Sequence, residues 1–310
     1  MASIGSKVVI LGTGGTIAGT AAQADDAVGY TAGRLDIGQL VAAVPTLRGG
    51  DLECEQIAQL DSKDMDFATW QLLTARAAEH LARAEVAGVV VTHGTDTLEE
   101  TAYLLHRVLA SSKPLVLTAA MRPATSIAAD GPQNLADAVA TARDARAHGV
   151  LVAFGGRVWA GAEVRKVHSY RVDAFAAGDA GPLALIEEGV LHWQREPLRS
   201  EALGLVRIAR DAAAWPRVEI VTSYAGATGA MVDALVAQGV RGIVVAGTGN
   251  GTLHRELEAA LLRAQSAGVQ VLRSTRCAAG PVIGQAMLRS AGTLSPVQAR
   301  VELLLQLLDR

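Results

Sequence analysis

The stretch of residues 89–101, which reads V-V-V-T-H-G-T-D-T-L-E-E-T, constrains the fold more than any other part of this sequence. The valines at its start are typical of a strand buried on both faces of a parallel sheet. Residues 97–110 carry apolar side chains at helical spacing, so a helix is expected there. Thr95 and Asp96 would then lie at the carboxyl end of the strand, the edge at which open α/β sheets bind ligands. They either cap the helix or form part of a site.

A second stretch, residues 8–19, repeats this arrangement with the letters V-V-I-L-G-T-G-G-T-I-A-G. An apolar strand again runs into a turn of small residues with a hydroxyl, Thr16, at its end. The glycines before Thr16 permit backbone conformations closed to other residues and let a ligand approach closely. The turn is not a dinucleotide fingerprint, because Ile17 takes the place of the third glycine, and no Gly-Lys-Ser/Thr follows to make a P-loop. The later glycine-rich run 247–251 fails the same test, because Thr252 holds its last position.

Strands and helices are expected to alternate along almost the whole chain, which is typical of a parallel sheet covered by helices. Expected strands are 7–12, 52–59, 87–92, 114–118 and 150–154, then 217–222, 241–246 and 269–273. Expected helices are 36–44, 66–85, 97–110 and 132–148, then 227–238, 252–267 and 296–309. Residues 155–179 show no clean period, and 181–216 mix charges, prolines and short apolar runs, as a connection between domains would.

The expected fold class is therefore α/β with two open-sheet domains. The larger, amino-terminal domain would have a mostly parallel sheet with helices on both faces, and it would carry the catalytic residues. The smaller, carboxy-terminal domain would also be α/β. The expected boundaries are 1–190 for the first domain, 191–216 for a linker and 217–310 for the second domain.

Composition excludes several classes of partner. Of 310 residues, 28 are basic and 31 are acidic, and the net charge of −3 leaves no electrostatic footprint for nucleic acid. No apolar run is long enough to cross a bilayer, and no signal peptide precedes the first strand, so we expect no membrane partner and a cytoplasmic protein, or a periplasmic one if a leader has been removed. Cys54 and Cys277 fit neither a disulfide framework nor a metal site, and we expect buried free thiols. The histidines show no spacing that suggests zinc.

Thr16 and Thr95 are the candidate nucleophiles. A hydroxyl can attack an amide carbonyl to give an acyl-enzyme that water cleaves, but threonine must first be activated by a base or a proton-accepting network. Without further context, each threonine would more often be a cap or turn residue. Backbone amides around Gly15 and Gly94 are candidate donors to a carboxylate or a developing oxyanion. No Gly-x-Ser-x-Gly elbow exists to complete a triad with His93, which is expected to hold its turn through a ring hydrogen bond.

Two signatures, T-G-G-T-I-A at 13–18 and H-G-T-D-T at 93–97, stand in this order along the chain. Four further segments are A-A-M-R-P at 119–123, A-D-G-P at 129–132, G-T-G-N-G at 247–251 and S-A-G-T-L-S-P at 290–296. Together they resemble the motifs of the bacterial-type L-asparaginases and glutaminase-asparaginases, over nearly the whole chain. The resemblance implies the same division into a larger amino-terminal and a smaller carboxy-terminal domain.

The resemblance implies roles for the polar residues at the two strand ends. Thr16 would be the acyl-accepting nucleophile, and Tyr30 would polarise its hydroxyl. Tyr30 belongs to a small, polar segment between Gly19 and Arg34, which would close over the site as a lid; a plain surface loop is the alternative. Thr95 would work in the second half of the site, together with two residues considered next.

Lys166 matches the catalytic lysine of the family and would act with Thr95 and Asp96. A lysine serves as a base only if burial or a nearby cation lowers its pKa, so a solvated surface lysine is the alternative, and Arg165 next to it is a rival. Asp96 would also hold the α-ammonium group of a free amino acid, and Ser62 would hold the α-carboxylate.

This sequence departs from the family pattern at three places, all in substrate binding. Lys63 stands where the well-known periplasmic enzymes carry a glutamine near the α-amino group, so its ammonium must turn away, pair with an acid or alter recognition. Thr252 stands where those enzymes often have an asparagine or serine that reaches across from a neighbouring subunit. Residues 276–289 lack the glutamate that those enzymes contribute across the same interface.

The expected activity is hydrolysis of L-asparagine to L-aspartate and ammonia, without a metal or an organic cofactor. Glutamine is longer by one methylene, which a pocket discriminates by only about 1–3 kcal/mol, so some glutaminase activity is compatible with the sequence. The alternatives are an asparaginase-like amidotransferase subunit that supplies ammonia to a partner enzyme, and a non-catalytic sensor of asparagine or aspartate. The resemblance implies a homotetramer, a dimer of dimers, with its sites at interfaces between subunits.

Overall fold

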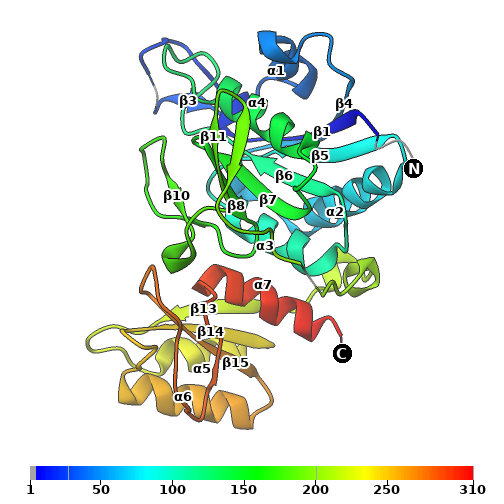
Figure 1. Cartoon of the computed structure of the whole chain (residues 1–310). Helices are drawn as coiled ribbons and strands as arrows, with labels where there is room; N and C mark the ends of the chain where they lie inside the picture. The colour runs from blue at the N-terminus through cyan, green and yellow to red at the C-terminus, as the bar shows by residue number, and fades with distance from the viewer. Residues whose placement is uncertain (1–4, 27, 200, 310) are drawn as a thin grey trace. The chain divides into compact units, whose positions relative to one another are not determined.

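The computed structural model describes residues 5–26, 28–199 and 201–309, and the chain divides into two compact units, Met1–Leu205 and Val206–Arg310 (Figure 1). Each unit contains a sheet with helices packed against it, so the expected α/β fold class is confirmed. The boundaries expected for the two domains and the linker stay a prediction.

The first unit is built on an eight-stranded sheet with the strand order β12-β11-β8-β7-β6-β5-β1-β4. Five of its strands are parallel, namely β1 (Lys7–Gly14), β4 (Leu52–Leu60), β5 (Val86–Thr92), β6 (Pro114–Thr118) and β7 (Gly149–Phe154). The remaining three, β8 (Arg157–Ala160), β11 (Ala184–Glu187) and β12 (Val190–Trp193), extend one edge by antiparallel pairing. The valine run of β5 is fully buried, as its β-branched composition predicts.

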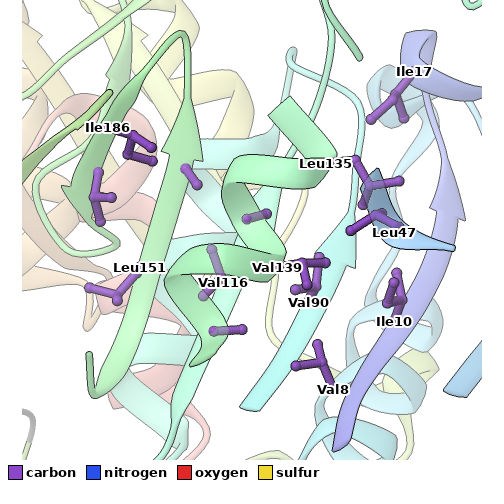
Figure 2. Packing of buried hydrophobic residues seen from close by; sticks show 14 of the residues in the cluster. Val8, Ile10, Ile17, Leu47, Val90, Val116, Leu135, Val139, Leu151 and Ile186 are labelled. Atoms are coloured by element: carbon purple, nitrogen blue, oxygen red, sulfur yellow. The ribbon is translucent and has the colours of Figure 1, made fainter. Parts of the chain in front are cut away.

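Helices cover both faces of this sheet. On one face, α1 (Ile37–Ala42) and α4 (Gly131–Arg143) pack on alternate strand residues such as Val8 and Val90, and Figure 2 shows this cluster around Leu135 and Val139. On the other face lie α2 (Phe67–Ala82) and α3 (Leu98–Val108), whose apolar residues pack with the intervening strand positions. The central strands are therefore apolar at every position, whereas the helices are apolar along one stripe.

The stretch expected to be irregular or to connect the domains instead contains three strands of the sheet. The turn between β7 and β8 is Gly155-Gly156, with φ of 59° and 69°, and the turn between β11 and β12 is Glu188-Gly189, with φ of 51° and 75°. Two-residue turns with positive φ at both positions join antiparallel strands into tight hairpins. Strands of four residues are too short to show a period in the sequence, which is why the sequence reading missed them.

The second unit contains a four-stranded parallel sheet with the order β13-β14-β15-β16. Its strands are β13 (Val218–Thr222), β14 (Gly242–Gly247), β15 (Gln270–Thr275) and β16 (Arg289–Ser290). The helices α5 (Ala230–Ala237) and α6 (Arg255–Ser266) share one apolar cluster with these strands, and α7 (Pro296–Leu307) also packs on β13, β14 and β15. The strand-helix alternation expected for this part of the chain is present.

The two cysteines correct one expectation. Cys54 and Cys277 are free, but both are exposed, so the expected burial is wrong. Cys54 lies on β4, an edge strand whose residues alternate between covered and exposed, and its thiol falls on an exposed position. Within the described ranges, every helix is too short or too polar to cross a bilayer.

Candidate active site

The candidate site lies where the direction of the chain changes in the first sheet. After β1 the chain continues to β4 on one side, and after β5 it continues to β6 on the other side, although β1 and β5 are neighbours. In open α/β sheets, such a switch point leaves a crevice beyond the carboxyl ends of the two strands. The turn after β1 carries Thr16, and the turn after β5 carries Thr95, so the topology brings both threonines to this edge of the sheet.

The turns at the strand ends are packed against each other through glycines. Gly15 has a φ of 81°, and a Cβ added there would lie 2.5 Å from the Cα of Gly94. A Cβ on Gly94 would in turn lie 2.4 Å from the Oγ of Ser62, which follows β4. Side chains do not approach so closely, so these glycines are required for the contact. Three neighbouring strand ends therefore hold Ser62, Thr16 and Thr95 next to one another.

Thr16 forms a short hydrogen bond with Tyr30. The Oγ of Thr16 and the hydroxyl oxygen of Tyr30 are 2.6 Å apart, and either group can donate. Thr16 is buried at the start of a 3-10 turn (Thr16–Ala18), and half-buried Tyr30 lies on the short strand β3 (Tyr30–Thr31), which pairs with β2 (Thr20–Ala21). The Tyr30 ring packs against Gly19, where an added Cβ would lie 2.8 Å from a ring carbon. The segment that carries Tyr30 is thus folded back onto the turn that carries Thr16.

The second set of contacting side chains in the site consists of Thr95, Lys166 and Asp96. The Nζ of Lys166 donates to the Oγ of Thr95 at 2.9 Å and to the Oδ1 of Asp96 at 2.6 Å. Thr95 is buried, the Lys166 side chain is 18% exposed, and the Asp96 side chain is 53% exposed. Lys166 lies on β9 (Arg165–Lys166), paired with β10 (Phe175–Ala176). One basic group thus contacts a buried hydroxyl and an exposed carboxylate at the same time.

Ser62 is buried between these groups. Its Oγ accepts a hydrogen bond from the amide of Asp96 at 3.2 Å, and its carbonyl accepts one from the Thr97 hydroxyl at 2.7 Å. The amide of Gly15, which was expected to face the substrate, donates to the carbonyl of Leu60 at 2.8 Å. A substrate carboxylate would have to compete with the Leu60 carbonyl for that amide.

Lys63 is turned toward acids. Its Nζ lies 2.6 Å from the Oδ2 of Asp64 and 3.2 Å from the Oδ2 of Asp61, and its side chain is 60% exposed. The hydrogen bonds to Asp64 and Asp61 raise the pKa of the Lys63 ammonium above its ordinary value. Of the arrangements considered for this lysine, the structure has the one in which it pairs with acids.

His93 is buried below the turn and is held in its neutral form. The indole NH of Trp70 donates to the Thr101 hydroxyl at 2.8 Å, so this hydroxyl directs its own proton to the Nε2 of His93, 3.0 Å away. The Nδ1 of His93 must then carry the ring proton, and it donates to the carbonyl of Gly94 at 2.7 Å. Burial lowers the pKa of His93 to about 4. The ring therefore fixes the peptide that precedes Thr95 without taking a proton at neutral pH.

Glu99 is a polar residue beside the site that the sequence reading did not single out. It lies in the first turn of α3, one turn after Asp96, and burial raises its pKa to about 7, with a further contribution from Glu100. Its carboxyl accepts a hydrogen bond from the backbone of Lys166, and its Oε2 is buried with no partner among the residues that the structure describes. A carboxylate three residues after Asp96, in the first turn of the helix that follows it, is the signal in the sequence.

The segments 119–123 and 129–132 support the ends of neighbouring strands in this unit. The Asp130 carboxylate accepts hydrogen bonds from the amides of Met121 and Arg122, both at 3.0 Å. Asn134, one turn further along α4, donates to the Ala119 carbonyl at 2.9 Å and accepts from the Gly155 amide at 3.0 Å. These bonds hold the ends of β6 and β7 beside the crevice.

Thr252 belongs to the second unit. It lies in the turn after β14, where its hydroxyl is 2.8 Å from that of Thr248. Within the part of the chain that the structure describes, no group of three or more His, Cys, Asp or Glu residues could hold a metal ion.

Comparisons with known proteins identify the family of this chain. A family model described as "Asparaginase, N-terminal" matches residues 7–199, and one described as "Glutaminase/Asparaginase C-terminal domain" matches residues 217–309. The chain is 38% identical to "Glutaminase-asparaginase" of Pseudomonas fluorescens biotype A, over 89% of this chain and 76% of that protein. It is also 38% identical to "L-asparaginase 2" of Escherichia coli K12, over 97% of this chain and 88% of that protein.

A solved structure supports the same assignment over the full length. The crystal structure of a probable cytoplasmic L-asparaginase from Campylobacter jejuni superimposes with a TM-score of 0.92 at 39% identity, covering 98% of this chain and 96% of that chain. Both halves of the chain match the family models, and the fold and most of the sequence match the relatives, so the chain belongs to the family of L-asparaginases and glutaminase-asparaginases.

Proposed function

We propose that this chain hydrolyses L-asparagine to L-aspartate and ammonia. The observation that carries the proposal is the pair of hydrogen-bonded groups at neighbouring strand ends, Thr16 with Tyr30 and Thr95 with Lys166 and Asp96. Each group contains a buried hydroxyl with a proton acceptor or a basic group in contact, which is what a threonine needs in order to attack an amide.

In the first half of the reaction, Thr16 attacks the side-chain amide of the substrate. The Thr16 proton passes toward the Tyr30 oxygen 2.6 Å away, a bond forms between the Thr16 Oγ and the carbonyl carbon, and the carbon–nitrogen bond breaks. The proton ends on the departing ammonia, and an acyl-enzyme remains. Water then attacks the ester, aspartate leaves, and the Thr16 hydroxyl is restored.

Thr95, Lys166 and Asp96 act in the same reaction from the other side of the crevice. In the proposed mechanism the Lys166 Nζ, 2.9 Å from the Thr95 Oγ, orients that hydroxyl and lets it exchange a proton with the substrate or with the attacking water. Asp96 holds the ammonium group of Lys166 at 2.6 Å, and its exposed carboxylate is also the counter-ion for the substrate α-ammonium.

The remaining contacts of the substrate are assigned to the surrounding turns. Ser62 donates its hydroxyl proton to the α-carboxylate, with the backbone turn at Gly15 beside it. Lys63, which pairs with Asp61 and Asp64, contributes charge at the edge of the α-amino site rather than a direct bond. Thr252 completes the site from a second copy of the chain in a homotetramer, a dimer of dimers.

We also propose a substrate preference, a cellular location and domain limits for this chain. A relative named glutaminase-asparaginase supports some turnover of glutamine. A cytoplasmic location is supported by the name of the similar Campylobacter jejuni protein. The proposed domain limits are 1–190 and 217–310, with the linker 191–216. The family model that matches 217–309 supports the start of the second domain, whereas the model that matches 7–199 extends into the proposed linker.

The test is ammonia release from L-asparagine by the wild type and by Thr16→Val, which removes the hydroxyl and keeps the shape. We expect the variant to lose at least about 10³-fold in kcat, because the nucleophile is gone. Thr46→Val, at an exposed threonine, is the matched control and should turn over normally. Undiminished turnover by Thr16→Val would reject Thr16 as the nucleophile.

Two outcomes would favour the alternative functions. Calorimetric binding of asparagine or aspartate by the wild type, with no ammonia released over hours, would indicate a sensor. Ammonia release that requires an added acceptor enzyme would indicate an amidotransferase subunit. In either case Asp96→Ala should weaken asparagine binding, because the α-ammonium loses its counter-ion.

A further inference from the structure

Lys166 lies on a very short strand, although its ammonium group must be placed accurately. Its strand, β9, consists of two residues and pairs only with β10, also of two residues, in a ribbon separate from the eight-stranded sheet. The ribbon is fixed on the β10 side, where Phe175, opposite Lys166, packs edge-on against Phe154 of β7 with 4.8 Å between ring centres. On the β9 side, Val164, directly before the strand, is fully buried in the same apolar cluster as Phe175, and a further attachment at Lys166 itself would fix the direction of its ammonium group toward Thr95.

Glu99 provides that attachment. Its carboxyl accepts a hydrogen bond from the backbone amide of Lys166. Because its Oε2 is without a partner within the described residues, the bond is made by Oε1. Asp96, three residues earlier, holds the Lys166 Nζ at 2.6 Å. Asp96 lies just before the N-cap of α3 and Glu99 in its first turn, so this stretch of chain holds Lys166 at two points, its backbone and its ammonium group.

We infer that Glu99 is a positioning residue for Lys166, which fixes the backbone of β9 so that the ammonium group meets Thr95 and Asp96. The inference rests on the proposed function and assigns a role that it does not contain. Glu99 touches no reacting atom, and it acts through the lysine.

The electrostatic surroundings indicate that the position of the acceptor oxygen matters more than its charge. Burial, with a smaller contribution from Glu100, raises the pKa of Glu99 to about 7 against the opposing effects of Arg165 and Lys166. The carboxyl is therefore partly protonated near neutral pH, and Oε1 accepts the Lys166 amide proton in either form. Two variants separate position from charge.

Glu99→Gln keeps an acceptor oxygen at the same reach and removes the charge, whereas Glu99→Asp keeps the carboxylate and withdraws it by about 1.5 Å. We expect Glu99→Gln to keep kcat for asparagine within about twofold of the wild type. We expect Glu99→Asp to lower kcat about tenfold with KM within about twofold, because a misplaced Lys166 affects the transition state more than substrate binding. Glu100→Asp, the same shortening one residue along, is the matched control and should leave kcat unchanged.

A second readout does not depend on turnover. Hydrogen exchange of the Lys166 amide should quicken about tenfold in Glu99→Asp and stay as in the wild type in Glu99→Gln and Glu100→Asp. Melting temperatures identify any variant that does not fold, and Glu99→Met, which fills the space without an acceptor, replaces Glu99→Asp if that variant fails, with the same expectations.

Any one of three results overturns the inference. In the first, Glu99→Asp keeps both the kcat and the protection of the Lys166 amide that the wild type has. In the other two, Glu99→Gln is impaired as much as Glu99→Asp, or Glu100→Asp shows the same losses as Glu99→Asp. If the wild type releases no ammonia, the proposed function fails, while the exchange of the Lys166 amide still decides whether Glu99 holds it.

Discussion

His93 leads to a quantitative prediction about stability in acid. Its ring is neutral in the folded protein because burial lowers its pKa from 6.5 to about 4, whereas in the unfolded chain the ring binds a proton near its ordinary pKa. The lowered pKa contributes stability that is fully present above about pH 6.5 and is lost as the pH falls toward 4. At about 1.4 kcal/mol per pKa unit, the loss over this interval is about 3 kcal/mol.

The variant that isolates this contribution is His93→Asn. Its side-chain amide keeps a donor for the Gly94 carbonyl but does not titrate, and it leaves the Thr101 hydroxyl without its acceptor. We expect the variant to be less stable than the wild type near pH 7 by about 1–3 kcal/mol. By pH 4 the wild type should lose about 3 kcal/mol relative to the variant, which closes or reverses the difference, because only the wild type gains a proton at this site on unfolding.

The assay is equilibrium unfolding in urea at a series of pH values from about 7 to 4, at one protein concentration so that any subunit association enters both proteins equally. Other titrating groups are common to wild type and variant and cancel in the difference. Parallel curves for the two proteins would refute the reasoning.

Three further predictions for single substitutions follow from contacts in the structure. Tyr30→Phe removes the partner 2.6 Å from the Thr16 Oγ, and kcat for asparagine should fall about 10²-fold with an unchanged melting temperature. Gly15→Ala should lower the melting temperature far more than Gly49→Ala, since both glycines have positive φ but only Gly15 would bring its Cβ within 2.5 Å of another residue. Lys63→Gln should lower KM for asparagine about two- to fivefold and leave KM for succinamate, which lacks the α-ammonium, unchanged, as steady-state kinetics with both substrates will show.

The parallel part of the first sheet was readable from the sequence because the strands β1, β5, β6 and β7 are mainly apolar on both faces, and β1 and β5 are followed by glycines and hydroxyls. The same reasoning placed Thr16 and Thr95 at strand ends. It could not say which strands are neighbours, because pairing is set by the order in which the chain crosses the sheet. The contact between Gly15 and Gly94 depends on that order, and only the structure displays it.

Three other features could not be predicted from the sequence, each for a different structural reason. The hairpin β11–β12 turns on Glu188, a non-glycine residue at φ of 51°, so its turn has no obvious marker. Cys54 was expected to be buried because cysteine usually is, but a strand at the sheet edge exposes alternate positions. Glu99 was overlooked because acids are common in the first turn of a helix, and its contact with Lys166 joins segments far apart in the sequence.

The stacked turns at Gly15, Gly94 and Ser62 limit how a protein of this kind can be altered in the laboratory. Each turn fills the volume that a larger residue on the neighbouring turn would require. A larger side chain on one turn can therefore be accommodated only if the neighbouring turn moves away. Single-site libraries at these positions will return mostly unfolded clones. Productive diversity for a changed amide preference has to be introduced around them, at solvent-facing positions such as Lys63.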